Sequence, residues 1–170
     1  MVQESRDETV SESPESIPPC LIFIDKEGRW YHQGVEMIHR DFVQLFYQNM
    51  RMDSEGRYII EWDGATCYVD VEDTAFVVTR VSYEVEEGGE RSRFLLSLSD
   101  DSLEALAPET LRVGKDHVLY CSVKSAAFPA RFSRPAYYQL AQHIEEDKGV
   151  YLLPLNGQRY PIREGPAGVD

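Results

Sequence analysis

Short runs of alternating apolar and polar residues, separated by glycine turns, dominate the sequence and restrict it to a mostly β fold. The longest example is the pair of runs "AFVVTRVSYEVEE" (75–87) and "RSRFLLSLS" (91–99), which flank a Gly-Gly pair at 88–89. Alternation with period two places one face of each run against a core, and Gly-Gly between two such runs is typical of a hairpin. The sequence therefore predicts a long antiparallel hairpin over residues 75–99.

A Gly-Arg-aromatic pattern recurs where other strands begin. It is present in "EGRWY" (27–31) and "EGRYI" (55–59), and with one inserted residue in "NGQRYP" (156–161). Glycine allows the chain to turn, and the arginine and the aromatic residue then lie on opposite faces of the next strand. We interpret the pattern as a turn device rather than a binding motif. The strands predicted in addition to the long hairpin are 21–25, 29–32, 57–62, 66–71, 117–124, 128–132 and a hairpin over 150–162.

Two segments have the apolar spacing of helices. The first runs from about residue 40 to residue 51. The second begins after Ser133, a good N-cap, has Pro135 in its first turn and is expected to run to Gly149. Its apolar stripe comprises Ala136, Tyr137, Leu140, Ala141 and Ile144.

Because strands and helices are segregated, the sequence predicts an α+β fold with antiparallel sheets. A division near residue 100 gives two halves, 18–99 and 100–163, with one main helix each. Residues 1–17, rich in Glu and Ser, are predicted to be a disordered acidic tail, and residues 164–170 a second loose tail.

The charge of the chain restricts its partners. Seventeen Lys and Arg against 30 Asp and Glu give a formal net charge of −13. Such a surface repels a polymeric nucleic acid, whereas a small anion needs only a few local donors. The longest apolar runs, such as "CLIFI" at 20–24, are too short to span a membrane, so no membrane partner is expected. A basic and then apolar leader is absent near Met1, which predicts a cytoplasmic protein. Association with a second copy of the chain stays open.

The three cysteines are widely spaced, at 20, 67 and 121. A disulfide framework or a thiolate metal site is expected to show closer or paired spacing. We therefore expect reduced, partly buried cysteines that pack as small apolar residues.

The sequence contains no nucleophile elbow, Walker loop or dinucleotide-binding glycine pattern. Asp70, Glu72 and Asp73 lie close together, as acid–base or cation-binding groups would, but the wet side of a half-buried strand followed by a turn explains them equally well. His143 and Glu146 have the i,i+3 spacing of two metal ligands on one helix face, which an exposed helix surface also explains. We expect neither a metal nor a cofactor, and a protein that is not an enzyme.

The stretch "ARFSRPAYY" (130–138) is the most suggestive of binding. Arg131 and Arg134 flank Ser133 at the start of the second helix, where guanidinium groups and the positive helix end suit a phosphate or carboxylate. Tyr137 or Tyr138 is placed to stack on a base. The alternative is that both arginines pair with carboxylates such as those of Glu72 or Asp73.

Three segments together resemble a bacterial family known as domain of unknown function 1285, over most of residues 20–162. They are "GRWYHQGVEMIHRDFVQLF", "DGATCYVDVEDTAFVV" and "FPARFSRPAYYQL". The matching positions are Gly28, Trp30, Gly34, Arg40, Leu45 and Phe46; Val71, Glu72, Asp73 and Phe76; and Ala130, Arg131, Arg134, Tyr137, Tyr138 and Leu140. The chain departs from the pattern at "EWDGAT" (61–66), where a Thr-Pro stretch is usual, and at its end, which lacks a glycine-rich close.

The resemblance implies two related α+β halves, the second like a pleckstrin-homology barrel, with a nucleotide-like ligand in the cleft between them and a role in signal transduction. It assigns no catalytic residues. Our hypothesis is a non-enzymatic binding or regulatory protein for a small anionic or nucleotide-like ligand. The alternatives are an adaptor for protein partners without a pocket and, third, an enzyme that uses Asp70, Glu72 or Asp73. The expected ligand-binding residues are Trp30, Arg40, Glu72, Asp73, Arg131, Arg134 and Tyr137.

Overall fold

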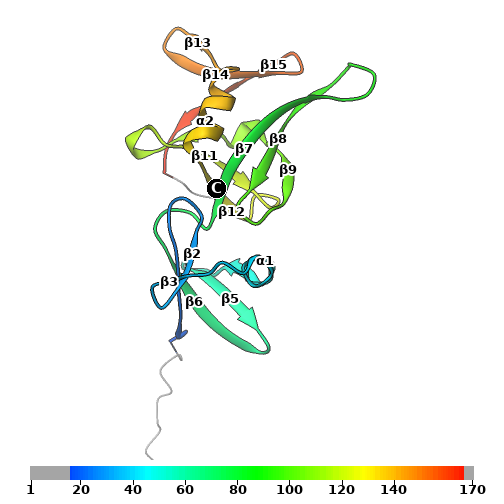
Figure 1. The fold of residues 1–170 in the computed structure, drawn as a ribbon. Coiled ribbons are helices and arrows are strands. Elements are labelled where there is room, and N and C mark those ends of the chain that lie inside the picture. The colour runs from blue at the N-terminus through cyan, green and yellow to red at the C-terminus, as the bar shows by residue number, and fades with distance from the viewer. Residues whose placement is uncertain (1–15, 167–170) are drawn as a thin grey trace, which may run out of the picture.

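The computed structural model describes residues 16–166, which fold into two large mixed sheets, a small sheet and two α-helices (Figure 1). The first sheet has the strand order β3-β2-β1-β6-β5-β4, and helix α1 (Arg40–Gln48) packs with it. Its strands are β1 (Pro19–Ile24), β2 (Trp30–His32), β3 (Val35–Glu36), β4 (Met50–Met52), β5 (Tyr58–Trp62) and β6 (Ala65–Val71). This sheet and α1 form the lower part of the molecule in Figure 1.

The second sheet has seven strands in the order β16-β10-β11-β12-β7-β8-β9 and carries helix α2 (Arg134–Ala141). Its strands are β7 (Phe76–Val85), β8 (Ser92–Leu98), β9 (Leu103–Ala105), β10 (Arg112–Val113), β11 (Leu119–Val123), β12 (Phe128–Phe132) and β16 (Arg163–Glu164). Two single 3₁₀ turns, Pro108–Thr110 and Lys115–His117, lie between strands. The small sheet, β13 (Glu145–Asp147), β14 (Val150–Leu155) and β15 (Gln158–Pro161), lies at the upper end of Figure 1.

The α+β class, the presence of both helices and the expected hairpins are confirmed, although α1 ends at Gln48 rather than near residue 51, which lies in β4. β7 and β8 pair antiparallel from Val85↔Ser92 to Val78↔Leu98, and β14 and β15 turn at Asn156–Gly157. The expectation of antiparallel sheets is wrong in part, because β1 pairs parallel with β6, β12 with β7, and β10 with β16. The expected pleckstrin-homology-like barrel is also not formed: within residues 16–166 the seven-stranded sheet is open, with β16 and β9 at its edges.

The chain passes from one sheet to the other between β6 and β7, whereas residue 100 lies inside the second sheet, between β8 and β9. The long hairpin belongs to the second sheet because β7 pairs parallel with β12, from Phe76↔Ala130 to Val78↔Phe132. Most of the predicted disordered tail 1–17, and the end of the predicted loose tail 164–170, lie outside the described residues. Glu164 itself is in β16.

The Gly-Arg-aromatic pattern is a turn device in its first two copies. Asp25 accepts hydrogen bonds from the backbone N–H groups of Glu27 and Arg29, each at 2.9 Å, and its second oxygen accepts one from Arg29 Nε at 2.8 Å. Asp53 makes the same contacts with residues 55 and 57. Gly28 follows Asp25 with φ +81°, a conformation that glycine adopts without strain. A side-chain-capped loop therefore precedes each strand.

Helix α2 begins as predicted and ends earlier than predicted. Ser133 is the N-cap, and its Oγ accepts a hydrogen bond from the N–H of Ala136. The helix ends at Ala141, and Glu145–Asp147 form strand β13, which pairs with β14 through a turn at Lys148–Gly149. Three carboxylates at a helix C-terminus would oppose the helix dipole, whereas the hairpin leaves them in water.

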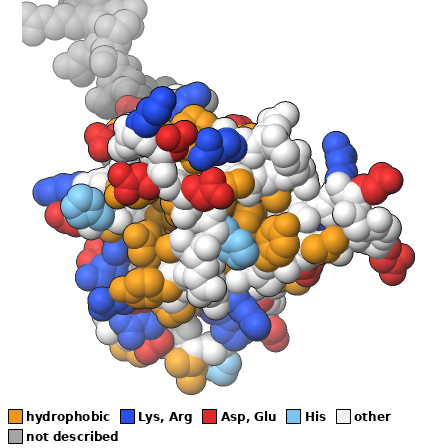
Figure 2. Space-filling view, turned by 90° about the horizontal axis from the view of Figure 1, so that it is seen from above, with side chains coloured by type: hydrophobic (Ala, Val, Ile, Leu, Met, Phe, Trp, Pro, Cys, Tyr) orange, Lys and Arg blue, Asp and Glu red, His pale blue; other side chains and the backbone are white. Residues whose placement is uncertain are grey.

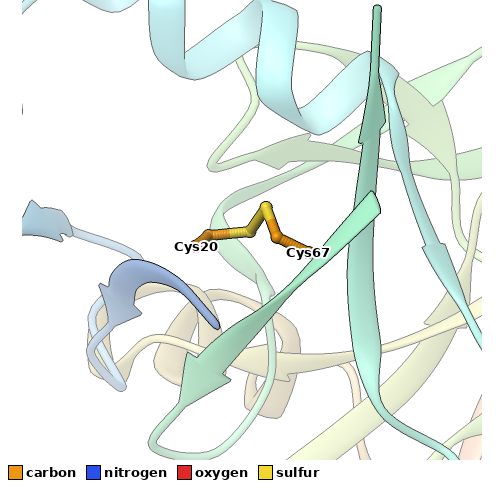
Figure 3. Close-up of a disulfide and its surroundings, with 2 residues drawn as sticks. All are labelled: Cys20 and Cys67. Atoms are coloured by element: carbon orange, nitrogen blue, oxygen red, sulfur yellow. A yellow bond between two sulfur atoms is a disulfide. The ribbon is translucent and has the colours of Figure 1, made fainter. Parts of the chain in front are cut away.

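The expectation of three reduced cysteines is wrong. Cys20 on β1 and Cys67 on β6 form a disulfide, with Cα atoms 5.0 Å apart, although 47 positions separate them in sequence (Figure 3). The two cysteines meet because β1 and β6 pair parallel in the first sheet. The spacing of cysteines along the sequence does not reveal which strands pair. Cys121 is free and buried, and burial raises the pKa of its thiol. Among residues 16–166, no helix is long and apolar enough to cross a membrane.

Candidate functional site

Two adjoining cavities beside α2 form the candidate site. The first, of about 350 Å³, brings Arg131, Arg134 and Tyr137 together, with Tyr138 and Asp116 also in its lining. The second, of about 470 Å³, has a mixed lining, in which the apolar side chains of Val113, Ala141, Ile144 and Ile162 lie with Tyr151 and the carboxylate of Glu146. His117, Leu119 and Tyr137 line both cavities. We call the two together the α2 groove.

The α2 groove lies at the end of the molecule that carries the small sheet. Figure 2 views this end and shows apolar side chains gathered in the middle of the face, with basic and acidic side chains around them. Helix α2, the loop before β11 and strand β14 supply the groove. A ligand with a charged part and an apolar part could therefore contact both kinds of surface at once.

Arg131 is paired within the protein. Its Nη1 lies 2.7 Å from Asp73 Oδ2, and the hydroxyl of Tyr120 donates to the same oxygen at 2.8 Å. Burial and this hydrogen bond to the carboxylate raise the pKa of Tyr120 to about 12. The structural pairing foreseen as the alternative for the arginines therefore holds for Arg131.

Arg134 is placed differently. Its guanidinium lies 6.0 Å from the centre of the Tyr138 ring, and no carboxylate of residues 16–166 lies within ion-pair distance of it. Arg134 is exposed, so its charge is available to a ligand. Asp116, in the same cavity, offsets part of this charge.

The helix start contributes fewer donors than expected. Pro135 has no N–H, and the N–H of Ala136 is taken by Ser133. Tyr137 donates its N–H to the carbonyl of Ser133 at 2.8 Å. Attraction for an anion must therefore come mainly from the arginine side chains.

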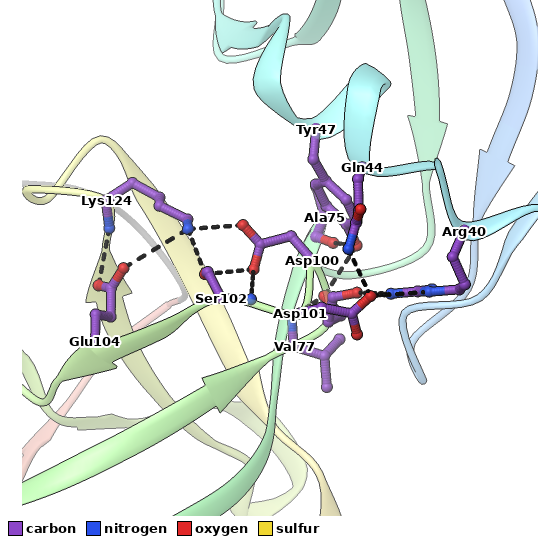
Figure 4. A network of polar contacts seen from close by, with 11 residues as sticks. Arg40, Gln44, Tyr47, Ala75, Val77, Asp100, Asp101, Ser102, Glu104 and Lys124 are labelled. Atoms are coloured by element: carbon purple, nitrogen blue, oxygen red, sulfur yellow. Dashed lines mark hydrogen bonds and ion pairs between the residues drawn. The ribbon is translucent and has the colours of Figure 1, made fainter. Parts of the chain in front are cut away.

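The other four predicted ligand residues do not line this groove. Trp30 is buried in the core, 4.7 Å from Tyr47 between ring centres, and Glu72 accepts a hydrogen bond from the backbone N–H of Lys26. Asp73 lies behind Arg131 as its partner. Arg40 bonds Asp101 and the carbonyl of Ser99, which ties α1 to the second sheet (Figure 4).

Polar contacts join α1 to the second sheet in the region between the two large sheets. The hydroxyl of Tyr47 bonds the Ala75 carbonyl at 2.8 Å and Ser99 Oγ at 2.9 Å, and Ser99 Oγ accepts from Val77 N (Figure 4). Burial raises the pKa of Tyr47 above its usual value. The structure thus separates the α2 groove from the region where the family resemblance implied a cleft.

The three carboxylates considered for catalysis have separate roles. Asp70 is exposed, Glu72 caps the Lys26 turn, and Asp73 accepts from Arg131 and Tyr120. His143 and Glu146 do not share a helix face, because α2 ends before them; the ring of His143 packs against Phe94 instead. In the described part of the chain, no group of three or more His, Cys, Asp or Glu side chains is arranged to hold a metal ion.

One cluster was missed by the sequence analysis. Lys124 Nζ lies 2.6 Å from Ser102 Oγ and 2.7 Å from Asp100 Oδ2, beside Glu104 (Figure 4). A serine next to a lysine could serve as a nucleophile and base only if the lysine were neutral. Burial acts to raise the pKa of Asp100, but the hydrogen bonds from Lys124 and Ser102 lower it overall, which favours the charged form of this carboxylate. The contacts are those of an ion-pair network.

The groove residues that sequence reasoning missed include Asp116, His117, Leu119, Tyr151 and Ile162. They come from the start of β11 and the loop before it, and from the chain that follows α2. No local pattern relates these segments to "ARFSRPAYY", so the apolar part of the groove had no signal in the sequence.

Two crystal structures of DUF1285 family proteins resemble this structure. The first, from Silicibacter pomeroyi DSS-3, matches with a TM-score of 0.71 and 18% identity, covering 86% of this chain and 83% of that chain. The chain has the fold of DUF1285 family proteins. The second, from Shewanella baltica OS155, matches with a TM-score of 0.58 and 18% identity, covering 72% of this chain and 91% of that chain. At this identity the likeness to the DUF1285 proteins is one of fold. No protein-family model and no curated protein matches the sequence.

Proposed function

We propose that this protein is a non-enzymatic binding module that holds a small anionic ligand with an aromatic or apolar part, such as a nucleoside monophosphate, in the α2 groove. The observation that carries the proposal is the junction at Tyr137 and His117, where a cavity containing Arg134 adjoins one that has apolar side chains in its lining. The guanidinium of Arg134 would bind the anion, and the ring of Tyr137 would contact the base.

The dimensions of the groove support this ligand class. The two cavities, of about 350 and 470 Å³, fall within the range of roughly 300 to 1,000 Å³ that is usual for small-molecule sites. The acidic surface as a whole, with a net charge of −13, would repel larger polyanions while a local arginine still attracts a small one. A regulatory role in signal transduction, in which the ligand is sensed rather than converted, is part of this proposal.

Isothermal titration with adenosine 5′-monophosphate tests the proposal. The wild type is compared with Arg134→Ala and with Arg91→Ala, which removes the same charge from the exposed turn between β7 and β8. Loss of a charge-assisted hydrogen bond should weaken binding by about tenfold or more in Arg134→Ala, while Arg91→Ala stays within about twofold. Equal affinities in all three proteins, or a wild type that binds none of the nucleotides in a thermal-shift screen, would reject the groove as an anion site.

A second candidate function is an adaptor for protein partners. It is favoured by exposed apolar side chains at a sheet edge: Leu103, on edge strand β9, is 63% exposed, and Val85 near the adjacent hairpin turn is 57% exposed. An adaptor of this kind would no longer bind its partner after Leu103→Ser but would still bind it after Arg134→Ala, which distinguishes it from the first proposal. Cross-linking of the tagged protein in its source cells measures whether the partner is bound.

The cytoplasmic location also stays a proposal. Disulfides persist mainly in oxidising compartments, and the Cys20–Cys67 bond makes the location open to direct test. Alkylation of free thiols in freshly lysed cells would label Cys20 and Cys67 in a reducing cytoplasm and leave both unlabelled in an oxidising compartment.

A further inference from the structure

A separate cavity of about 470 Å³ lies on the first sheet, against α1 and far in the fold from α2. Its lining is almost entirely apolar and includes Ile22, Phe42, Phe46, Ile60 and Trp62. Among residues 16–166, His32 is the one ionisable side chain apart from the cysteines in this lining, and no Lys, Arg, Asp or Glu contributes to it. Its volume is ample for a small molecule, and its chemistry suits an uncharged, apolar one.

Large apolar side chains are exposed to water at the rim of this cavity. Phe42 is 58% exposed and Trp62 is 48% exposed, on α1 and β5 respectively. A ligand that covers such surface gains a favourable binding free energy of roughly 25 cal/mol per Å² of apolar area removed from water. The segment before residue 16, "MVQESRDETVSESPE", leads towards Cys20, but its acidic composition does not match an apolar lining. The chemistry of the lining therefore favours an occupant from outside the chain.

The Cys20–Cys67 disulfide forms part of the cavity wall. Both cysteines line the cavity, and Figure 3 shows the bond linking β1 and β6 close to helix α1. The β1–β6 ladder pairs Pro19 with Tyr68 and resumes at Phe23 with Asp70, with an irregularity between them. The covalent bond thus joins the two strands within the stretch where the hydrogen-bonded register is broken.

The backbone next to Cys20 is unusual in the same stretch. Leu21 has φ +61°, in the left-handed region that a bulky residue rarely adopts. Backbone pairing holds β1 to β6 on either side of this stretch, at Pro19 and at Phe23. Within the stretch, the disulfide is a covalent restraint that keeps residue 20 near β6.

We propose that this cavity is a binding site for an uncharged apolar small molecule, and that the Cys20–Cys67 disulfide controls its affinity. In the reducing direction, a dithiol reductant transfers two electrons and two protons: the Cys20–Cys67 S–S bond breaks to give two thiols, and the reductant becomes a disulfide. Release of Cys20 from Cys67 loosens this stretch of the cavity wall and weakens binding. By linkage, a bound ligand makes the disulfide harder to reduce by the same factor.

Titration with Nile red, an uncharged apolar dye, tests the site. The expected result is saturable binding of one dye per chain with a blue shift of Trp62 emission, which Trp62→Phe abolishes while the buried Trp30 remains. Ala65→Phe, which fills the cavity from β6, should weaken binding at least tenfold, and Leu103→Ser on β9 should not change it. Unsaturable binding, equal binding by Ala65→Phe, or binding confined to a dimer seen by light scattering overturns the site.

The redox control has its own test. Cys20→Ser/Cys67→Ser should bind Nile red at least tenfold more weakly than the oxidised wild type. If that variant fails to fold, the fraction of wild-type disulfide in dithiothreitol redox buffers is measured with and without the dye. The dye should shift the midpoint towards more reducing buffers, and an unchanged midpoint overturns the control by the disulfide.

Discussion

Arg131 and Asp73 form an ion pair of 2.7 Å between strand β12 and the segment before β7, and Tyr120 donates to the same carboxylate oxygen. Both side chains are about one-fifth exposed, at 23% and 21%. The pair holds the end of β12 to the chain that links the two large sheets. It occupies the charge of Arg131, whereas Arg134 has no carboxylate of residues 16–166 within ion-pair distance.

Replacing Asp73 by Asn should separate these two roles. Arg131 would lose its carboxylate partner, so the free energy of unfolding should fall by about 1–3 kcal/mol in urea. The affinity for adenosine 5′-monophosphate should rise, because a second guanidinium charge becomes available in the groove. Glu61→Gln, which breaks the exposed pair with Arg51, is the matched control and should change neither quantity appreciably. A drop in both stability and affinity would contradict the account.

Alkaline pH should destabilise the fold through two buried tyrosines. Burial raises the pKa of Tyr58 to about 12, and burial and Asp73 raise that of Tyr120 to about 12, from the ordinary value of 10.0. The folded state therefore holds these protons more tightly than the unfolded state. The stabilisation is fully present below pH 10 and is lost as pH rises from 10 towards 12.

The slope of stability against pH measures this effect. Each tyrosine contributes up to about 1.4 kcal/mol per pH unit between the two pKa values. Urea unfolding at pH 8, 10 and 11 should show a shallower decline for Tyr58→Phe than for Tyr151→Phe, which removes an exposed hydroxyl. Identical slopes in both variants would show that Tyr58 does not carry the dependence.

Arg40 should stabilise the contact between α1 and the second sheet. Its Nη2 lies 2.8 Å from the Ser99 carbonyl and 2.7 Å from Asp101, but the side chain is half exposed, so solvent weakens the ion pair. Arg40→Ala should lower the free energy of unfolding by about 1 kcal/mol. Arg51→Ala, at an exposed pair within the first sheet, should cost less than about 0.5 kcal/mol. Equal costs would mean that the inter-sheet contact adds nothing.

Features fixed by neighbouring residues could be predicted from the sequence. Asp25 and Gly28, like Asp53 and Gly56, build their turns within five residues, and Ser133 caps a helix three positions from its partner. The end of α2 was mispredicted because the apolar stripe continues to Ile144. The residues after Ile144 instead form a hairpin, in which β13 and β14 are joined by the Lys148–Gly149 turn.

Features that depend on distant strands left no local signal. The disulfide requires β1 beside β6, and the place of the long hairpin requires β7 parallel to β12; parallel pairing is not encoded by any turn. The candidate site divides in the same way. Arg131, Arg134 and Tyr137 come from one short segment and were found, whereas His117 and Tyr151 reach the groove only through the folded chain.

The most direct test of the central claim is a titration of the ¹⁵N-labelled protein with adenosine 5′-monophosphate, followed by amide chemical shifts. Binding in the α2 groove predicts saturable shifts concentrated at residues 117–119 and 131–141, and no comparable shifts at Arg40, Ser99 or Asp101. Shifts concentrated at these three residues would place the ligand between the two large sheets instead. Either that pattern or the absence of saturable shifts would contradict binding in the α2 groove.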